Sequence, residues 1–469
     1  MRYGNIKELK DTLKGIVDFG AHTTTKVLDT RRLREEVIDR LVYNAVFNDG
    51  GDIRDASRWL IYEISNHLGI RPASIKRLYE LMGKGEVSGF TVPAINIRAL
   101  TYDVARATIR SALKENIGAF IFEIARSEIG YTQQRPVEYA VVILGAAIRE
   151  NYLAPVFLQG DHFQIALKKY QQDPVPEINA VKALIREAIE AGFYNIDIDT
   201  STLVDLSKRD VNEQQRVNFE LAAELTAYIR TLQPEGIAIS VGGEIGEVGG
   251  KNSTVEDFRC FMDGYTREVK KRGAHITGIS KISVQTGSSH GGVPLPDGSI
   301  AEVELDFTVH SEISTVAKQE YGLAGTVQHG ASTLPDEAFD KFSQYDTAEI
   351  HLATGFQNII YDSEFFPTQL RDKMYAYIQD KHADEREPDQ TREQFIYKTR
   401  KRALGPFKEA IWNIPEERRE KIGEELERKF DLLFKKLNVH GTLEMVKKYA
   451  ITADIRRPVP GILLESEDQ

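Results

Sequence analysis

Between Phe90 and Thr354, short runs rich in β-branched residues alternate with longer helical stretches, and this alternation constrains the fold more than any other feature of the sequence. Alternation of this kind is typical of a parallel sheet covered by helices. Eight candidate strands start at Thr91, Ala119, Ala154, Tyr194, Gly236, Gly278, Leu323 and Thr347. Eight strand–helix units favour an α/β fold of the closed (β/α)₈ TIM barrel type over an open doubly wound sheet. No GxGxxG follows the first run, so the main indication of a dinucleotide fold is missing.

The segments on either side of this region have the pattern of helices. Residues 1–89 read as successive amphipathic helices, and a highly charged helical run, EERREKIGEELERKFDLLFKKL, starts at Glu416. We therefore expect an N-terminal helical extension over 1–89, the barrel over 90–380 and a C-terminal helical extension over 381–469. The charged run fits either a solvated helix face or a helix that contacts another subunit.

The composition indicates a soluble globular protein. It is 41% hydrophobic and 28% charged, and no apolar run approaches the roughly 20 residues of a membrane helix, so we expect no membrane partner. The N-terminus lacks the apolar stretch of a secretory signal, and the single Cys260 forms no internal disulfide; both favour the cytoplasm. A formal net charge of -11 argues against nucleic-acid binding, which needs a basic surface. An anionic substrate would need a local positive site.

Histidines and carboxylates gather at the carboxyl ends of the proposed strands, the face on which barrel enzymes build active sites. They are, in strand order, Asp161 and His162; Asp197, Asp199 and Ser201; Glu244 and Glu247; His290; His329 and Ser332; and His351 and Thr354. One such histidine alone is more often structural, but zinc favours imidazole and takes three protein ligands where substrate must bind. His162, His290 and His329 are therefore the candidate zinc ligands. His351 is either a fourth participant or a hydrogen-bonding residue.

Glycines accompany the last three of these strand ends. Gly287, Gly291 and Gly292 surround His290, Gly330 follows His329, and Gly355 follows Thr354. Glycines let backbone N–H groups approach an anion, and barrels commonly bind phosphate in the loops after strands seven and eight. Ordinary turn glycines would give the same pattern. A phosphate site that uses the Ser332 and Thr354 hydroxyls is the functional interpretation.

Seven motifs occur in the order found in one known family: VPAINI, GDH, NIDIDTS, EIGEVGGKN, GSSHGG, VQHGAS and EIHLATG. Over roughly Lys84 to Thr354 the chain resembles the class II, metal-dependent fructose-bisphosphate aldolases. The resemblance implies a Zn²⁺ ion, or another divalent metal, on the three histidines, with Glu244 beside it. Asp161 is then the acid/base at the C4 hydroxyl, and Asp199 and Ser201 support the site.

The same resemblance implies a substrate site and an assembly. The residues that it assigns to the substrate and its phosphate are Asn96, Gly291, Gly330, Ser332, His351, Ala353 and Thr354. A monovalent cation would lie near Gly291 and Gly330, and the partner molecules would be a phosphorylated ketose and further copies of this chain, in a homodimer or a larger homo-oligomer.

Three positions depart from the family pattern. Asn252 stands where the loop usually supplies an acid, so Glu256 or Asp257 becomes the candidate for the second proton transfer, unless that base is missing. We take Glu256 as the prediction. Ala125 stands where strand two commonly bears a serine, and His351 stands at the usual asparagine of strand eight. These departures concern the substrate rather than the metal.

The leading functional hypothesis is reversible cleavage of a ketose bisphosphate to dihydroxyacetone phosphate and an aldehyde, with fructose 1,6-bisphosphate first and tagatose 1,6-bisphosphate second. A C4 epimerase that breaks and rejoins the same bond is the alternative. A non-catalytic sugar-phosphate-binding subunit is a third interpretation, motivated by Asn252, Ala125 and the terminal helices.

Overall fold

The eight predicted strands form a closed parallel barrel in the computed structural model, which describes residues 1–19, 25–246, 251–287, 295 and 305–464. They are β4 (Val92–Asn96), β5 (Ile121–Ala125), β6 (Val156–Gln164), β7 (Asn195–Asp199), β8 (Ser240–Glu244), β9 (Lys281–Val284), β10 (Thr326–Gln328) and β11 (Thr347–Leu352). Each strand pairs with the next, and β11 pairs with β4 to close the barrel. The (β/α)₈ fold class expected from the sequence is confirmed.

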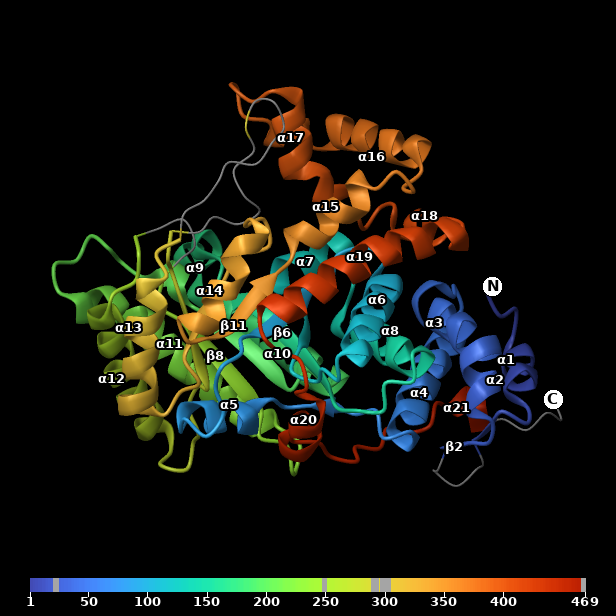
Figure 1. The fold of residues 1–469 in the computed structure, drawn as a ribbon, viewed down its shortest axis with the longest axis horizontal. Helices are drawn as coiled ribbons and strands as arrows, with labels where there is room; N and C mark the ends of the chain where they lie inside the picture. Colours follow the sequence, from blue (N-terminus) through green and yellow to red (C-terminus); the bar gives the residue numbers. More distant parts are fainter. Residues whose placement is uncertain (20–24, 247–250, 288–294, 296–304, 465–469) are drawn as a thin grey trace.

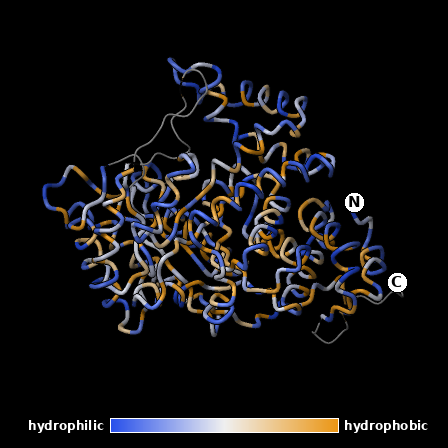
Figure 2. The backbone as a smooth tube through the Cα atoms, viewed as in Figure 1, coloured by the Kyte–Doolittle hydropathy of each residue, from blue (hydrophilic) through white to orange (hydrophobic). Residues whose placement is uncertain are grey.

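Helices surround the barrel in chain order (Figure 1). They are α6 (Thr101–Lys114), α7 (Arg126–Thr132), α8 (Pro136–Arg149), α9 (Leu167–Gln172), α10 (Pro174–Ala191), α11 (Val211–Leu232), α12 (Val255–Arg272), α13 (Thr308–Tyr321), α14 (Phe339–Gln344) and α15 (Thr354–Asp362). The sequence sets their ends: α10 starts where the Asp173 side chain accepts from the Val175 N–H, and stops at Gly192, whose φ of 102° favours glycine. Hydrophobic and hydrophilic residues alternate along these helices (Figure 2), and the buried ones, such as Val181, Leu184, Ile185 and Ala188 of α10, belong to the hydrophobic core.

The N-terminal segment is helical apart from a hairpin. It contains α1 (Ile6–Leu13), α2 (Thr30–Arg32), a π-helical turn (Leu33–Val37), α3 (Ile38–Phe47), α4 (Gly51–His67) and α5 (Lys76–Gly83). The hairpin of β1 (Val17–Phe19) and β2 (Thr25–Val27) was missed, because strands of three residues are too short to show a period. The short β3 (Pro72–Ala73) pairs with the start of β6. Helix α5 then lies below the barrel (Figure 1) and sends Tyr79 into its interior, where the hydroxyl donates to Glu349 of β11.

The chain after the barrel is helical, and all but the last residue of its first helix, α16 (Thr368–Lys381), lies within the range 90–380 that the sequence pattern assigns to the barrel. The same part of the chain also contains α17 (Arg392–Thr399), α18 (Lys408–Trp412), α19 (Glu416–Lys436), α20 (Leu443–Tyr449) and α21 (Gly461–Leu464), with 3₁₀ turns at Ala383–Glu385 and Arg400–Ala403. The charged helix α19 packs along α6 and buries an apolar stripe made of Ile422, Leu426, Phe430, Leu433 and Phe434. Some of its charged residues pair with neighbouring elements, as Glu427 does with Arg110 at 2.8 Å and Lys429 with Asp336 at 2.5 Å. Whether the rest of the charged face is solvated or contacts another subunit stays a prediction.

The end of the chain returns to the N-terminal helices. Trp59 of α4 donates to the Arg457 carbonyl at 3.2 Å, and the Arg457 guanidinium lies 3.6 Å from the centre of the Tyr62 ring. Buried apolar side chains form one continuous cluster that includes residues of both terminal segments. The three-part division of the chain stays a prediction. No helix in the described ranges combines the length and apolar character needed to cross a membrane.

Candidate metal and active site

A cavity of about 870 Å³ opens at the carboxyl ends of the barrel strands, within the size range of small-molecule sites. Strand ends contribute Glu123, Ala125, Asp161, His162, Asp199, Glu244, His329 and His351 to its lining. This is the face on which the sequence places the chemistry. Residues that lie up to about 230 positions apart in the chain meet here because parallel strands all end at the same edge.

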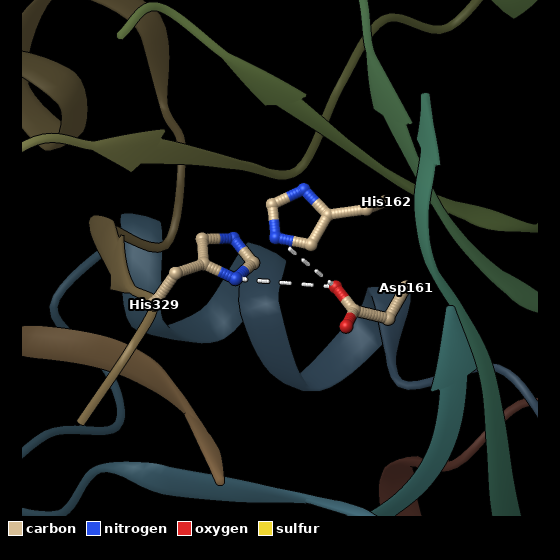
Figure 3. Close-up of side chains that lie close together, drawn as sticks. All are labelled: Asp161, His162 and His329. Atoms are coloured by element: carbon tan, nitrogen blue, oxygen red, sulfur yellow. Dashed lines mark ion pairs between the residues drawn. The ribbon is translucent and has the colours of Figure 1, made fainter. Parts of the chain in front are cut away.

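Asp161, His162 and His329 form the centre of the site (Figure 3). Asp161 Oδ1 lies 3.8 Å from His162 Nε2 and 3.9 Å from His329 Nδ1. His162 occupies a β-bulge after Gly160, with a φ of 39° that is uncommon for a residue other than glycine. A Cβ on Gly160 would lie 2.5 Å from the Phe163 ring, so the bulge needs glycine there. The local strain turns the histidine toward the cavity.

The other nitrogen of each histidine is held from behind. His162 Nδ1 lies 3.0 Å from Asp199 Oδ2 and 3.2 Å from Glu244 Oε2, while the Ser201 hydroxyl donates to Asp199 Oδ1 at 2.7 Å. His329 Nε2 lies 2.9 Å from Ser283 Oγ, a partner that the sequence did not reveal. Partners of this kind orient metal-binding histidines and fix their tautomers. Both rings therefore present the remaining nitrogen toward Asp161.

These donors fit a divalent cation. The ligand atoms of Asp161, His162 and His329 all lie within 4.8 Å of one another, so a cation between the two imidazole nitrogens would have the Asp161 carboxylate next to it. Imidazole nitrogen is a ligand that Zn²⁺ favours. A second group, His162, Asp199 and Glu244, also has its ligand atoms within metal-binding range. The predicted third histidine ligand, His290, and the neighbouring Gly291 lie outside the described residues.

The site has an excess of buried carboxylates. Burial and the nearby Asp199 raise the pKa of Glu244 to about 8, and burial and Asp161 raise the pKa of Glu123 to about 8. Burial opposes protonation of His162, but the Asp161 and Glu244 carboxylates outweigh it and hold the His162 pKa well above its usual value. A bound cation would supply the positive charge that these carboxylates require.

Part of the predicted phosphate site lies on the β10–β11 side of the cavity. Gly330, Ala353 and Thr354 line it, and Thr354 is the first residue of α15, where backbone N–H groups favour an anion. Ser332 is not part of the lining. Its carbonyl packs against Gly355, where an added Cβ would lie 2.4 Å from that oxygen. The sequence interpretation missed Arg98, whose Nη1 lies 3.2 Å from Thr354 Oγ1.

Two other predicted residues are absent from the described cavity lining. Asn96 is buried and donates to Glu128 Oε2 at 2.6 Å, which places it behind the lining. Glu256 is exposed on the first turn of α12, so the structure does not bring it to the cavity, and its role in proton transfer stays a prediction. Asp257 forms the capping box of α12 with Thr254, which is a structural role.

The outer wall of the cavity carries cations. Arg126 is the first residue of α7 and Lys169 lies in α9. Lys398 and Lys401 come from α17 and the turn after it, above the barrel in Figure 1. Burial and the neighbouring Arg98 guanidinium lower the pKa of Lys401. The sequence pattern placed these lysines in a helical extension and gave no sign that they face the site. The cavity is thus acidic at its floor and basic at its rim.

Comparison with known proteins agrees with this arrangement. The family model described as class-II fructose-bisphosphate aldolase matches residues 76–424. The chain belongs to this family. A fructose-bisphosphate aldolase of Giardia intestinalis is 25% identical over 163 residues, which are 34% of this chain and 42% of that protein. The match thus spans less than half of the length of that relative.

Two solved structures share the fold of this class II aldolase family member. A fructuronate-tagaturonate epimerase from Cohnella laeviribosi superimposes with a TM-score of 0.57 at 12% identity, covering 85% of this chain and 90% of that one. A probable tagatose 6 phosphate kinase from Sinorhizobium meliloti 1021 gives a TM-score of 0.51 at 17% identity, covering 78% and 95%. At these identities the likeness shows the fold alone.

The family match includes elements outside the predicted barrel limits. It starts at Lys76, the first residue of α5, and ends at Glu424 within α19. The helix below the barrel and the segment that brings Lys398 and Lys401 to the rim therefore both lie within the part of the chain that matches the class II aldolases.

Proposed function

We propose that the protein is a metal-dependent aldolase that reversibly cleaves a ketose bisphosphate, with fructose 1,6-bisphosphate as the first candidate, to dihydroxyacetone phosphate and a three-carbon aldehyde. The observation that carries the proposal is the position of the Asp161 carboxylate, less than 4 Å from the inward-facing nitrogens of His162 and His329. A proton-transfer group next to a candidate metal site is what this reaction needs.

The metal would be held by His162 and His329, with His290 as the predicted third ligand. Glu244, which the sequence interpretation put beside the metal, lies 3.2 Å from His162 Nδ1, the nitrogen that does not face Asp161. A divalent ion such as Zn²⁺ supplies a Lewis acid that stabilises the negative charge of the enediolate when the C3–C4 bond breaks. Neutral imidazole ligands leave the ion its full charge. Ser201 and Asp199 keep the His162 ring in place.

Asp161 would handle the proton of the C4 hydroxyl. In cleavage its carboxylate accepts that proton as C4–O becomes the aldehyde carbonyl, and the electron pair of the C3–C4 bond stays on C3. In condensation Asp161 returns the proton to the new hydroxyl oxygen. A second group must protonate C3 of the enediolate; Glu256 is the sequence prediction for it, and its exposed position does not support that role.

The anionic groups of the substrate would lie toward the rim and the β10–β11 side. Thr354, Gly330 and the Arg98 guanidinium surround one candidate phosphate position. Lys398 and Lys401 offer positive charge farther out. Local cations of this kind let a chain with a formal net charge of -11 bind a substrate of the same sign.

The test is to incubate the zinc-loaded protein with fructose and tagatose bisphosphates and to resolve every product by chromatography. Triose phosphate trapped by a coupled dehydrogenase supports the aldolase. Asp161→Asn should lower cleavage by about 10²–10⁴-fold while the bound metal is retained. Full cleavage by this variant would rule out Asp161 as the acid/base.

A C4 epimerase is the second candidate. It is favoured by the epimerase among the solved structures of this fold, and by a cationic rim that suits a carboxylate as well as a phosphate. The same metal site and Asp161 would then break and rejoin the bond without releasing the fragments. A C4-inverted ketose without trapped triose supports this activity. Ligand binding without any metal-dependent turnover would instead support the non-catalytic subunit.

Three further expectations stay predictions: the monovalent cation near Gly330, the homo-oligomeric state and the cytoplasmic location.

A further inference from the structure

A network of charged side chains fills the barrel directly beneath the cavity. Lys281, Glu349 and Asp197 are all at least 95% buried, as are the uncharged Gln159 and Tyr79. Charges in such a place are costly unless they are paired and hydrogen-bonded. None of these residues has a role in the proposed chemistry. Their geometry therefore calls for an explanation.

Glu349 is the centre of this network. Lys281 Nζ donates to Glu349 Oε1, to Asp197 Oδ2 at 2.9 Å and to Gln159 Oε1 at 2.9 Å. Tyr79, from the helix below the barrel, donates to Glu349 Oε2. Both oxygens of the Glu349 carboxylate are thus fixed. Since every partner is on a barrel strand or in the helix that closes the barrel, the carboxylate has little freedom to move.

His351 connects this fixed carboxylate to the active site. Its Nε2 lies 2.7 Å from Glu349 Oε1, and its Nδ1 lies 3.1 Å from Asp161 Oδ1 and 3.0 Å from Glu123 Oε2. Carboxylate oxygens therefore face both ring nitrogens. A phosphate at His351 would be repelled by these carboxylates, so the geometry disfavours the phosphate-binding role that the sequence suggested for this residue.

We propose that His351, anchored from below by Glu349 and Lys281, is a positioning residue that holds the Asp161 carboxylate in the orientation needed for proton transfer at the C4 oxygen. The inference rests on the proposed function. Asp161 Oδ1 lies close enough to His162 and His329 for the carboxylate to turn and become a metal ligand itself. The hydrogen bond from His351 opposes that turn and keeps Asp161 available as an acid/base.

Two substitutions of His351 separate this role from a general structural one. In His351→Asn the amide nitrogen can take the place of Nδ1 and still bond Asp161, whereas His351→Leu is of similar size and has no donor. We expect His351→Leu to lower kcat for cleavage by about 10²–10³-fold with a similar KM, and His351→Asn to restore it to within about tenfold of the native protein.

A partial reaction supplies the decisive comparison. Metal-dependent exchange of the C3 proton of dihydroxyacetone phosphate with solvent breaks and re-forms a C–H bond and does not use the C4 hydroxyl. Exchange and bound zinc should therefore stay within about threefold of the native protein in both variants, while cleavage falls only in His351→Leu. Equal losses of cleavage and exchange, or unchanged cleavage in His351→Leu, would overturn the inference.

The lower part of the network is tested through Glu349. Glu349→Gln should lower cleavage but not exchange, because it weakens the support of His351. In Glu349→Gln, Lys281 keeps its ion pair with Asp197 at 2.9 Å, so this single substitution leaves no buried lysine without a carboxylate partner. The control is Glu63→Gln. Glu63 is another buried carboxylate, lies in α4 and pairs with Arg456, and its substitution should leave both reactions unchanged.

Crystal structures of the zinc-loaded native protein and of His351→Leu decide the question without an activity assay. A rotated Asp161 carboxylate in the variant supports positioning by His351; an identical orientation in both structures overturns it. If the native protein cleaves no ketose bisphosphate, the proposed function fails, and the comparison of the two structures still decides whether His351 positions Asp161.

Discussion

Lowering the pH from 7 to 5 should destabilise the fold through one buried histidine outside the active site, His310 of α13. Its ring is fully buried, with Nδ1 2.8 Å from Thr326 Oγ1 and Nε2 2.7 Å from Gln328 Oε1. Burial lowers the pKa of His310 to about 4 from its ordinary value of 6.5. The two partners belong to β10, directly before His329, so His310 ties its helix to a strand of the candidate metal site.

The sign and size follow from proton linkage. Between pH 6.5 and pH 4 the unfolded chain binds a proton at His310 that the folded chain does not, so the free energy of unfolding falls as the pH falls. With these two pKa values the cost at pH 5 is about 2 kcal/mol, against about 0.2 kcal/mol at pH 7. Below pH 4 the folded state also binds the proton, and the contribution stops growing.

The assay is urea unfolding of the native protein and of His310→Gln at pH 7 and pH 5. Gln can keep the hydrogen bond to Gln328 but does not titrate. The variant should be less stable than the native protein at pH 7, and its loss of stability on going to pH 5 should be smaller by about 2 kcal/mol. His67→Gln, at an exposed position, is the control and should change with pH as the native protein does. An equal pH dependence in His310→Gln and the native protein would refute the reasoning.

Three further outcomes are expected. Zinc binding to metal-stripped protein at pH 7 should release protons and weaken as the pH falls. The reason is that the carboxylates around His162 outweigh burial and hold the His162 pKa well above its usual value. Binding heats that do not depend on the ionisation heat of the buffer would contradict this. Gly355→Ala should displace the Ser332 carbonyl, which lies 2.4 Å from the position of the new Cβ. We expect KM for the phosphorylated substrate to rise by about tenfold or more. An unchanged KM would show that the segment around Ser332 does not shape the phosphate site. Lys401→Met should raise KM by about tenfold with little change in kcat. The control is Lys84→Met, at an exposed position, and an equal KM in the two variants would show that Lys401 does not bind the substrate.

The sequence predicts the barrel well because its strands carry a local signal. Each strand is a short apolar run between helical stretches, and the residue after such a run must lie at the shared edge of the sheet. That rule by itself is enough to bring Asp161, His162 and His329 together. It also places Thr354 and Gly330 on one side of the cavity.

The parts that were missed depend on long-range partners. Lys281 and Glu349 are 68 positions apart, and neither position alone shows that the two charges meet inside the barrel. Tyr79 looks like an ordinary aromatic residue of an amphipathic helix, and its contact with Glu349 spans 270 positions. Lys401 likewise reads as part of a solvated helical extension. The local periodicity of a sequence does not predict these long-range contacts, because they form only when distant segments pack together.

The ion pair beneath the cavity has a consequence for how sequences of this kind can diverge. Lys281 forms ion pairs with both Glu349 and Asp197 in the barrel interior, so the loss of the lysine leaves two buried carboxylates without their shared cation. Substitution of the lysine is therefore strongly coupled to substitution of the two acids. Relatives that lack the lysine should also lack at least one of the two acids. These positions should covary across the family although none of them touches the substrate.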